Sequence, residues 1–155
     1  MDIKRCIKES VSIIGKEGST NEGDGFIQRL WEEANGDFQS VLPLAKYNEN
    51  GNVAGVWGAM SDLSRSFKPW EENYTKGLYL AGVEVKDEVE APEGWVKWTI
   101  PGYEYLYVKC EDENVFSLVL AYMKDQNLEL AGAVHDFICP EENGQPYMYF
   151  PIRKL

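Results

Sequence analysis

One carboxylate and the only histidine of the chain stand side by side in the apolar segment AGAVHDFICP, at positions 131–140. An ionised aspartate in a buried strand is costly unless hydrogen bonds or a cation compensate its charge. Neighbouring strand residues point to opposite faces, so His135 and Asp136 cannot form a direct acid–base pair without a bulge. Asp136, with His135 nearby, is therefore a candidate ligand-binding residue. The alternative is that Asp136 accepts hydrogen bonds from neighbouring backbone or from His135 and binds nothing.

Four tyrosines are further candidates, because alternation along two predicted strands places them on one face. The segments YEYLYVKC and PYMYFPI alternate aromatic with aliphatic side chains, and the aliphatic set suits a helix-covered core. The residues that then face the other way are Tyr105, Tyr107, Tyr147 and Tyr149. Phenol rings offer stacking surface and hydroxyl donors to a cationic or aromatic compound. Alternatively, the four rings fill the seam between two halves of the protein.

Two tryptophans and two glutamates complete the candidate set. Trp57 is flanked by small residues in VAGVWGAM, which suits either a stacking platform or close packing of another sheet. Trp70 lies in a long connection, where it covers the cleft or anchors the loop. Glu84 and Glu104 are possible acids near the cleft, although Glu104 shares a face with aliphatic residues at the solvated start of its strand.

Motifs for cofactors, metals and covalent catalysis are missing from the sequence. There is no G-x-S-x-G, no G-x-G-x-x-G and no G-x-x-x-x-G-K-[ST]. Three cysteines at unrelated spacings and one histidine make neither a disulfide framework nor a metal site. We expect no cofactor, and an enzyme only if a carboxylate such as Asp136 or Glu104 activates water in a hydrolase.

Composition narrows the class of protein further. A chain of 155 residues is predicted to form one domain, residues 1–155. With 15 basic and 26 acidic side chains the formal net charge is −11, which argues against direct nucleic-acid binding. No apolar run is long enough to span a bilayer, and no signal peptide is recognisable, so we expect a cytoplasmic protein without membrane contact.

The elements that must position these residues follow one order twice. A strand from about residue 10, a helix within 23–36 and strands within 53–60 and 77–85 form the first set. After a linking strand, a strand at 103–110, a helix from about 113 to 125 and two final strands form the second. This order predicts an α+β fold with a duplicated strand-helix-strand-strand unit, at about 10–86 and 103–154. Two antiparallel sheets with helices packed on them would enclose a ligand cleft between the halves.

The duplicated order, with the segments IPGYEYLYVKC, VHDFICP and YMYFPIRK, resembles the GyrI-like small-molecule-binding domain, which is also the effector-binding domain of AraC-type and MerR-type transcription regulators. The resemblance covers about 10–154 and implies a cleft lined by aromatic residues and closed by carboxylates. It places Asp136 at the position of an acid on the penultimate strand, Tyr147 at that of a second acid, and Tyr149 at that of a pocket tyrosine. Aspartate is shorter than the usual glutamate, and Tyr147 carries no charge, so a monocation or a polar aromatic compound suits this chain better than a dication.

The predicted function is non-catalytic binding of small amphipathic compounds, cationic or aromatic, by a stand-alone effector-binding domain. Asp136 would supply charge, and the four tyrosines with Trp57 would supply stacking surface. One alternative is a protein-interaction module whose acidic surface acts on gyrase or on a transcription regulator. Another is a hydrolase of reactive small molecules. A homodimer is compatible with the sequence.

Overall fold

Eight strands and three α-helices make up the computed structural model, which describes residues 2–155. The strands are β1 (Lys4–Lys8), β2 (Val11–Ser19), β3 (Val56–Ser61), β4 (Leu78–Val85), β5 (Val96–Ile100), β6 (Tyr103–Lys109), β7 (His135–Cys139) and β8 (Gln145–Lys154). The helices are α1 (Phe26–Gly36), α2 (Glu71–Tyr74) and α3 (Val115–Asp125), with short 3-10 turns η1 (Thr20–Glu22), η2 (Phe38–Ser40), η3 (Leu42–Leu44) and η4 (Pro140–Glu142). The α+β class predicted from the sequence is confirmed.

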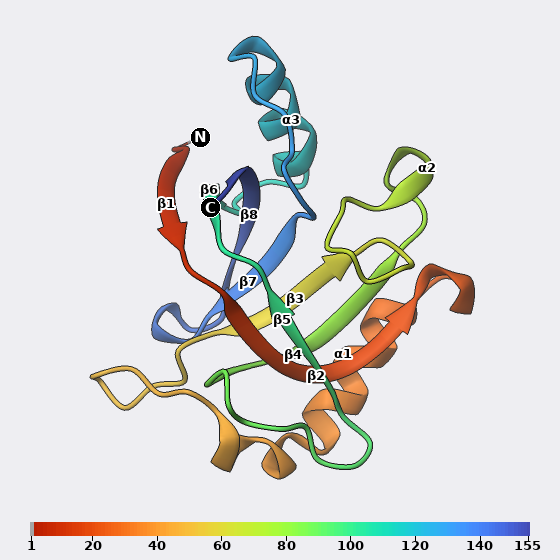
Figure 1. Ribbon diagram of the computed structural model, residues 1–155, viewed down its shortest axis with the longest axis vertical. Coiled ribbons are helices and arrows are strands. Elements are labelled where there is room, and N and C mark those ends of the chain that lie inside the picture. Colours follow the sequence, from red (N-terminus) through yellow and green to blue (C-terminus); the bar gives the residue numbers. More distant parts are fainter. Residues whose placement is uncertain (1) are drawn as a thin grey trace.

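The strands form one antiparallel sheet in the order β1-β6-β8-β7-β3-β4-β2-β5 (Figure 1). One half of the fold runs β2-α1-β3-β4, and the other runs β6-α3-β7-β8. The halves join where β3 pairs with β7, from Val56 opposite Ile138 to Gly58 opposite Asp136. The two sheets expected from the sequence are therefore continuous, because this pairing satisfies backbone groups that each half would otherwise leave open at its edge.

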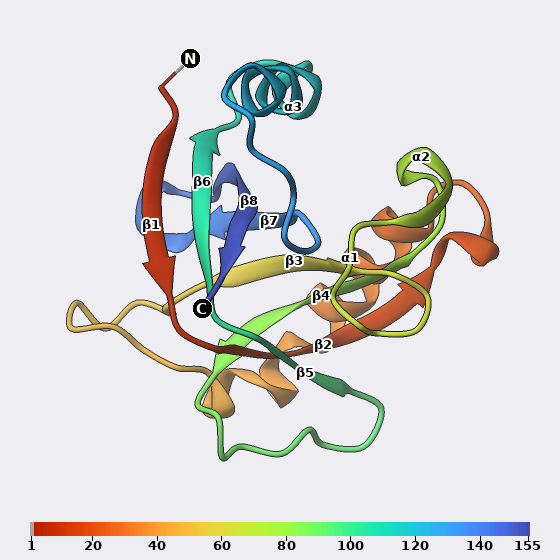
Figure 2. The same ribbon diagram turned by 45° about the horizontal axis from the view of Figure 1, so that its top comes forward.

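The first and last strands of the sheet are also linked, through two long bent strands. β1 runs into β2 and β5 runs into β6, and Figure 2 shows both bends. Lys8 of β1 pairs with Tyr103 of β6, and Val11 of β2 pairs with Ile100 of β5, so the two bent strands stay antiparallel neighbours on both sides of the bend. The sheet is consequently curled, with an inner and an outer face.

Strand β1 was not expected, because its sequence KRCIK lacks an apolar run. Its charged side chains suit an edge strand, where they oppose pairing with other chains.

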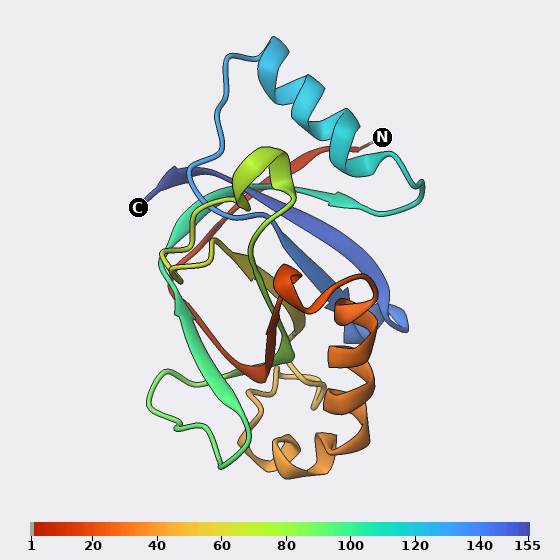
Figure 3. The ribbon, with the colours of Figure 1, turned by 90° about the vertical axis from the view of Figure 1, so that its right-hand side faces the viewer.

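Both long helices cover the outer face of the curl, at separate places (Figure 3). α1 buries Phe26, Leu30 and Ala34 against β2 and β4. α3 uses the same four-residue spacing to bury Val115, Val119 and Met123 against β6 and β8. The inner face forms a third core, rich in tryptophan and tyrosine. Within residues 2–155, no helix is long and apolar enough to cross a membrane.

Candidate ligand-binding site

The four candidate tyrosines share the inner face of the sheet, as their alternation predicts. Tyr107 and Tyr149 stack almost parallel, with ring centroids 5.1 Å apart and planes 9° from each other. Tyr105 meets Tyr149 edge to face at 5.6 Å, and Tyr147 lies 6.4 Å from Tyr107. Trp57 belongs to the same group, because its ring lies 5.3 Å from that of Tyr149. A continuous aromatic wall therefore crosses both halves; we call these five residues the aromatic wall.

Only part of the aromatic wall is open to a ligand. Trp57, Tyr105 and Tyr149 are 2%, 2% and 7% exposed, so their rings mostly fill the interior of the curl. Tyr107 and Tyr147 are half-buried and line an open cavity of about 480 Å³ at one end of the inner face. The wall therefore mostly fills the seam between the halves, and it borders open space at the end where Tyr107 and Tyr147 lie.

Asp136 lies on the opposite, outer face of the sheet. In the register of β3, β7 and β8 it stands between Gly58 and Met148, and its Oδ2 accepts a hydrogen bond from the Tyr79 hydroxyl at 3.1 Å. Tyr79 is part of the core beneath α1. The expectation that Asp136 lies among the four tyrosines is therefore wrong. The reason is register, since Asp136 faces Met148, whereas its neighbours His135 and Phe137 face Tyr149 and Tyr147.

A phenol compensates Asp136, but one that the sequence had not indicated. Tyr79 reaches the carboxylate across Gly58, where a Cβ would collide with the phenol oxygen. Trp31 Nε1 in turn donates to that oxygen at 3.2 Å. Burial raises the pKa of Asp136 to about 6, and the hydrogen bond from Tyr79 partly opposes this rise. Burial also raises the pKa of Tyr79, so this hydroxyl remains a donor at neutral pH. The one feature of the sequence that relates to this contact is Gly58, whose missing side chain leaves room for the Tyr79 hydroxyl.

No lysine or arginine among residues 2–155 forms an ion pair with Asp136. Within the described residues, one hydrogen bond, from Tyr79, supports its charge in a half-buried position. Such a carboxylate favours either a proton or an incoming cation.

An apolar cavity of about 200 Å³ lies on the outer face, beside the cross-strand partner of Asp136. Its lining comprises Met60, Pro69, Trp70, Tyr74, Phe116, Val134 and Met148. Met148 is the cross-strand partner of Asp136, and side chains directly opposite in a sheet lie side by side. Asp136 itself is not part of the lining, but Met148 places the carboxylate and the cavity on neighbouring strands of the same face; we call the cavity together with Asp136 the outer site.

The segment around α2 forms one wall of the outer site. Trp70 lines the cavity and is anchored by a hydrogen bond from its Nε1 to the Leu78 carbonyl at 2.9 Å. It packs with the outer-face core, so it anchors the loop but does not cover the cleft between the tyrosines. Tyr74 meets Phe116 of α3 edge to face at 5.2 Å, which joins this segment to the second half. Glu72, Asn73 and Tyr74 have φ angles of 50°, 59° and 63°, a left-handed turn that costs side-chain-bearing residues about 1 kcal/mol or more each.

His135 is fully buried and has a structural environment. Its Nδ1 accepts a hydrogen bond from the backbone N–H of Met60 at 3.0 Å. Burial lowers the pKa of His135 to about 3, so the ring is neutral. It therefore offers no charge to a ligand, and no hydrogen bond joins it to Asp136 in the described part of the chain.

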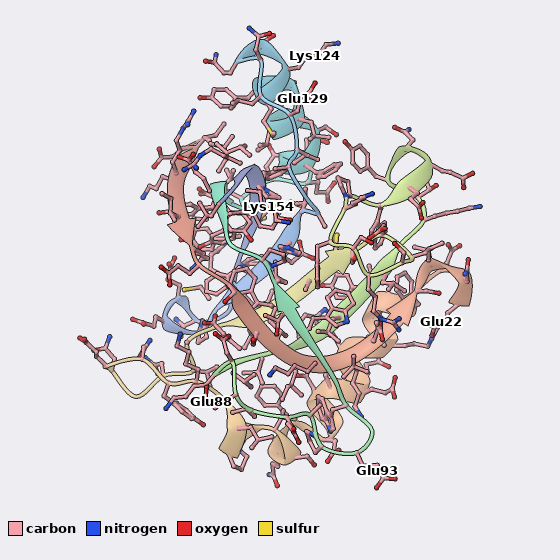
Figure 4. All side chains as sticks on the ribbon, viewed as in Figure 1. Glu22, Glu88, Glu93, Lys124, Glu129 and Lys154 are labelled. Carbon is pink, nitrogen blue, oxygen red and sulfur yellow. The ribbon has the colours of Figure 1, made fainter. Side chains whose placement is uncertain are left out.

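The two candidate glutamates are both engaged in ion pairs. Glu84 accepts a hydrogen bond from Trp57 Nε1 at 2.9 Å and lies 3.7 Å from Lys46 Nζ, on the inner face. Glu104 lies 3.1 Å from Arg153 and 3.9 Å from Arg5. Both carboxylates thus have a basic partner, which Asp136 lacks among the described residues. Other acidic residues, such as Glu22, Glu88, Glu93 and Glu129, lie scattered around the periphery (Figure 4).

Two strand-helix-strand-strand halves around one curled sheet form the GyrI-like fold, as the sequence resemblance implies. Similar solved structures include SAV2435 bound to tetraphenylphosphonium, with 15% identity, a TM-score of 0.66 and coverage of 99% of this chain and 94% of that chain. The C-terminal domain of EcmrR has 11% identity, a TM-score of 0.64 and coverage of 99% and 98%. A hydrolase from Listeria innocua has 11% identity, a TM-score of 0.52 and coverage of 97% and 91%. No family model and no curated protein matches the sequence.

Proposed function

We propose that this protein binds small amphipathic cations at the outer site, without converting them. The observation that carries the proposal is the half-buried carboxylate of Asp136, which has a phenol donor but no basic partner among the described residues. Its cross-strand partner, Met148, lines an apolar cavity on the same face. The cationic group of the ligand would lie against Asp136. Its apolar part would lie between Trp70, Tyr74 and the two methionines of the cavity.

The energetics of such a complex are favourable. Cation–π contacts with Trp70 and Tyr74 are worth about 0.5–2 kcal/mol each. Buried apolar surface adds about 25 cal/mol per Å², and a few hundred Å² therefore offset much of the entropy lost on binding. A known complex of a similarly folded protein with tetraphenylphosphonium supports the choice of a lipophilic cation.

The test is a calorimetric titration with benzyltrimethylammonium and with tetraphenylphosphonium, at pH 7.5, on the wild-type protein and on Asp136→Asn. Asparagine keeps the size and the hydrogen bond but removes the charge. We expect the variant to bind at least about tenfold more weakly, since hydrogen-bonded charges contribute about 1.5–3 kcal/mol. Glu93→Gln is the matched control, because it removes one exposed carboxylate at the opposite end of the molecule (Figure 4) and leaves Asp136 intact. Equal affinity in Asp136→Asn and wild type would refute the role of Asp136.

A second candidate function is hydrolysis. It is favoured by one observation, the Asp136 carboxyl with a pKa of about 6 beside a phenol, because general acids and bases work best with a pKa near the ambient pH. The hydrolase with a similar fold supports considering it. Release of 4-nitrophenol from 4-nitrophenyl acetate, above the buffer rate and lost in Asp136→Asn, would favour the hydrolase over simple binding.

A further inference from the structure

Three lysines border the aromatic wall on the inner face. They lie on the side of the sheet opposite to the outer site. Alternation along β1 places Lys4, Cys6 and Lys8 on the inner face, because Cys6 packs against the inner core. Lys8 Nζ lies 5.8 Å from the Trp57 ring centroid and 5.5 Å from that of Tyr149. Lys4 stands opposite Tyr107 in the β1–β6 register.

A third lysine comes from β6. Lys109 is two residues beyond Tyr107 on the same face, and it stands opposite Tyr147 in the β6–β8 register. Lys4 and Lys109 both line the inner cavity of about 480 Å³, together with Tyr107, Tyr147 and Tyr149. Ammonium groups and aromatic rings therefore converge on one open space.

Few carboxylates lie close to these three lysines, although the chain as a whole is strongly acidic. The net charge is −11, yet neither Lys8 nor Lys109 has a carboxylate within 4.0 Å among residues 2–155. Lys4 has one partner, Asp2, at 3.9 Å with a side chain 84% exposed, and such surface pairs contribute little. By contrast, Arg65 and Arg153 each have a carboxylate within 3.1 Å. Lysines with at most one weak ion pair, beside stacked tyrosines, fit an anion better than a cation.

The hydroxyl groups of the wall add hydrogen-bond donors. Within the described part of the chain, the hydroxyls of Tyr105, Tyr107 and Tyr149 form no hydrogen bond with protein atoms, whereas that of Tyr147 donates to Glu142 at 2.8 Å. Burial raises the pKa of Tyr105 and of Tyr149 well above the ordinary value, so these hydroxyls stay protonated. A ligand with oxygen acceptors would meet them as donors.

Three acids also line the same cavity, and two of them have partners. Glu142 is held by the Tyr147 hydroxyl, and Asp2 lies near Lys4. Glu111 is exposed at the end of β6. The negative group of a ligand would thus lie toward β1 and β6, between Lys4 and Lys109, with its ring against Tyr107 and Tyr149.

We propose that the inner cavity is a second binding site, which takes planar aromatic carboxylates. It goes beyond the proposed function, because it uses the other face of the sheet and the opposite ligand charge. The ring would extend the existing stack of Tyr107 and Tyr149, and the carboxylate would bind the ammonium groups of Lys4 and Lys109.

The test compares three ligands that share one ring system and differ in charge: 2-naphthoate, neutral 2-naphthamide and 2-naphthylmethylammonium. Calorimetric titration of the wild-type protein at low salt is expected to show 2-naphthoate binding about tenfold more tightly than 2-naphthamide. Equal affinity of the two, tighter binding of the ammonium compound, or no binding of 2-naphthoate at millimolar concentration would overturn the proposal.

Variants then locate the site. Lys4→Gln and Lys109→Gln are each expected to weaken 2-naphthoate binding about threefold and to leave 2-naphthamide unaffected. Lys124→Gln is the matched control, because Lys124 lies at the far end of α3 (Figure 4) and its loss should change nothing. Asp136→Asn should also leave 2-naphthoate binding unchanged, which separates this site from the outer one. Wild-type affinity for 2-naphthoate in Lys4→Gln and Lys109→Gln would overturn the assignment.

Discussion

Asp136 and Tyr149 lie on opposite faces of the same sheet, although the two strands that carry them are hydrogen-bonded neighbours. The acid faces the helices, and the tyrosine faces the interior of the curl. The carboxylate and the aromatic wall are therefore on separate faces, and a single cleft that combines both, as the sequence suggested, does not form.

Cation binding at the outer site should depend on pH. Because the pKa of Asp136 is about 6, the carboxylate is ionised at pH 7.5 and takes up a proton as the pH falls through 6. We expect the affinity for benzyltrimethylammonium to fall below pH 6 by up to about tenfold per pH unit. Titrations between pH 5 and 8 measure this. A flat profile in the wild-type protein would contradict the assignment of Asp136 as the counter-ion.

The same carboxylate should affect stability. Its pKa rises from 3.8 to about 6 on folding, so between pH 6 and 4 the folded protein binds a proton that the unfolded chain does not. The contribution of Asp136 to the free energy of unfolding thus increases as the pH falls from 6 to 4. Asp136→Asn should be at least as stable as wild type at pH 7.5 and lose that advantage near pH 4, in urea unfolding curves. A variant that is less stable at pH 7.5 would show that burial costs this charge little.

His135 should have the opposite effect. Its pKa falls from 6.5 to about 3 on folding, so between pH 6.5 and 3 the unfolded chain takes up a proton that the folded protein refuses. His135→Gln retains an acceptor for the Met60 N–H and removes this titration. Relative to wild type, the variant should gain about 1.4 kcal/mol in the free energy of unfolding for each pH unit below 6.5. A constant difference from pH 7 to 4 would mean that the imidazole becomes charged in the folded state.

Tyr79→Phe should raise the pKa of Asp136 above 6, because the hydroxyl of Tyr79 favours the ionised carboxylate. NMR titration of the Asp136 carboxyl carbon measures it directly. Trp31→Phe is a useful comparison, since it removes the donor to Tyr79 and leaves the Tyr79–Asp136 bond in place. A pKa of Asp136 that is unchanged in Tyr79→Phe would contradict the hydrogen bond.

Gly58→Ala should disrupt this arrangement by sterics alone. The added methyl group would occupy the space of the Tyr79 hydroxyl and lie against the Asp136 side chain. We expect a loss of about 1–3 kcal/mol in the free energy of unfolding and weaker cation binding. Gly36→Ala, where a Cβ has free space, is the control and should be neutral or slightly stabilising. Wild-type stability of Gly58→Ala would mean that Tyr79 does not need the gap.

Alternation was sufficient to predict which side chains share a face within one strand. It placed Tyr105 with Tyr107 and Tyr147 with Tyr149, and both pairs lie inward. Alternation does not determine which residue of the next strand lies opposite, because that depends on the turn. The β7–β8 connection contains η4 and a left-handed Asn143, and this geometry sets Asp136 opposite Met148. The local sequence pattern could therefore not predict on which face of the sheet Asp136 lies.

Contacts across long sequence separations were equally out of reach. Tyr79 looked like one more apolar residue in GLYLAGVEV, and only the β3–β4 and β3–β7 pairings bring it to Asp136. Strand β1 has no apolar repeat of its own, and it is recognisable only once β6 provides a partner. The order of the remaining elements, by contrast, follows from local periodicity.

Because of the two bent strands, the two halves of the chain should fold and unfold together. The strand that precedes each half, β1 or β5, is hydrogen-bonded to the other half. Removing either half would therefore leave the backbone groups of a strand unpaired. Closing these ladders joins residues far apart in the sequence, such as Lys4 with Tyr107 and Val11 with Ile100, and such non-local pairings make folding slow. The molecule should consequently unfold in one concerted transition, and fragments that end between β4 and β5 should remain unstructured.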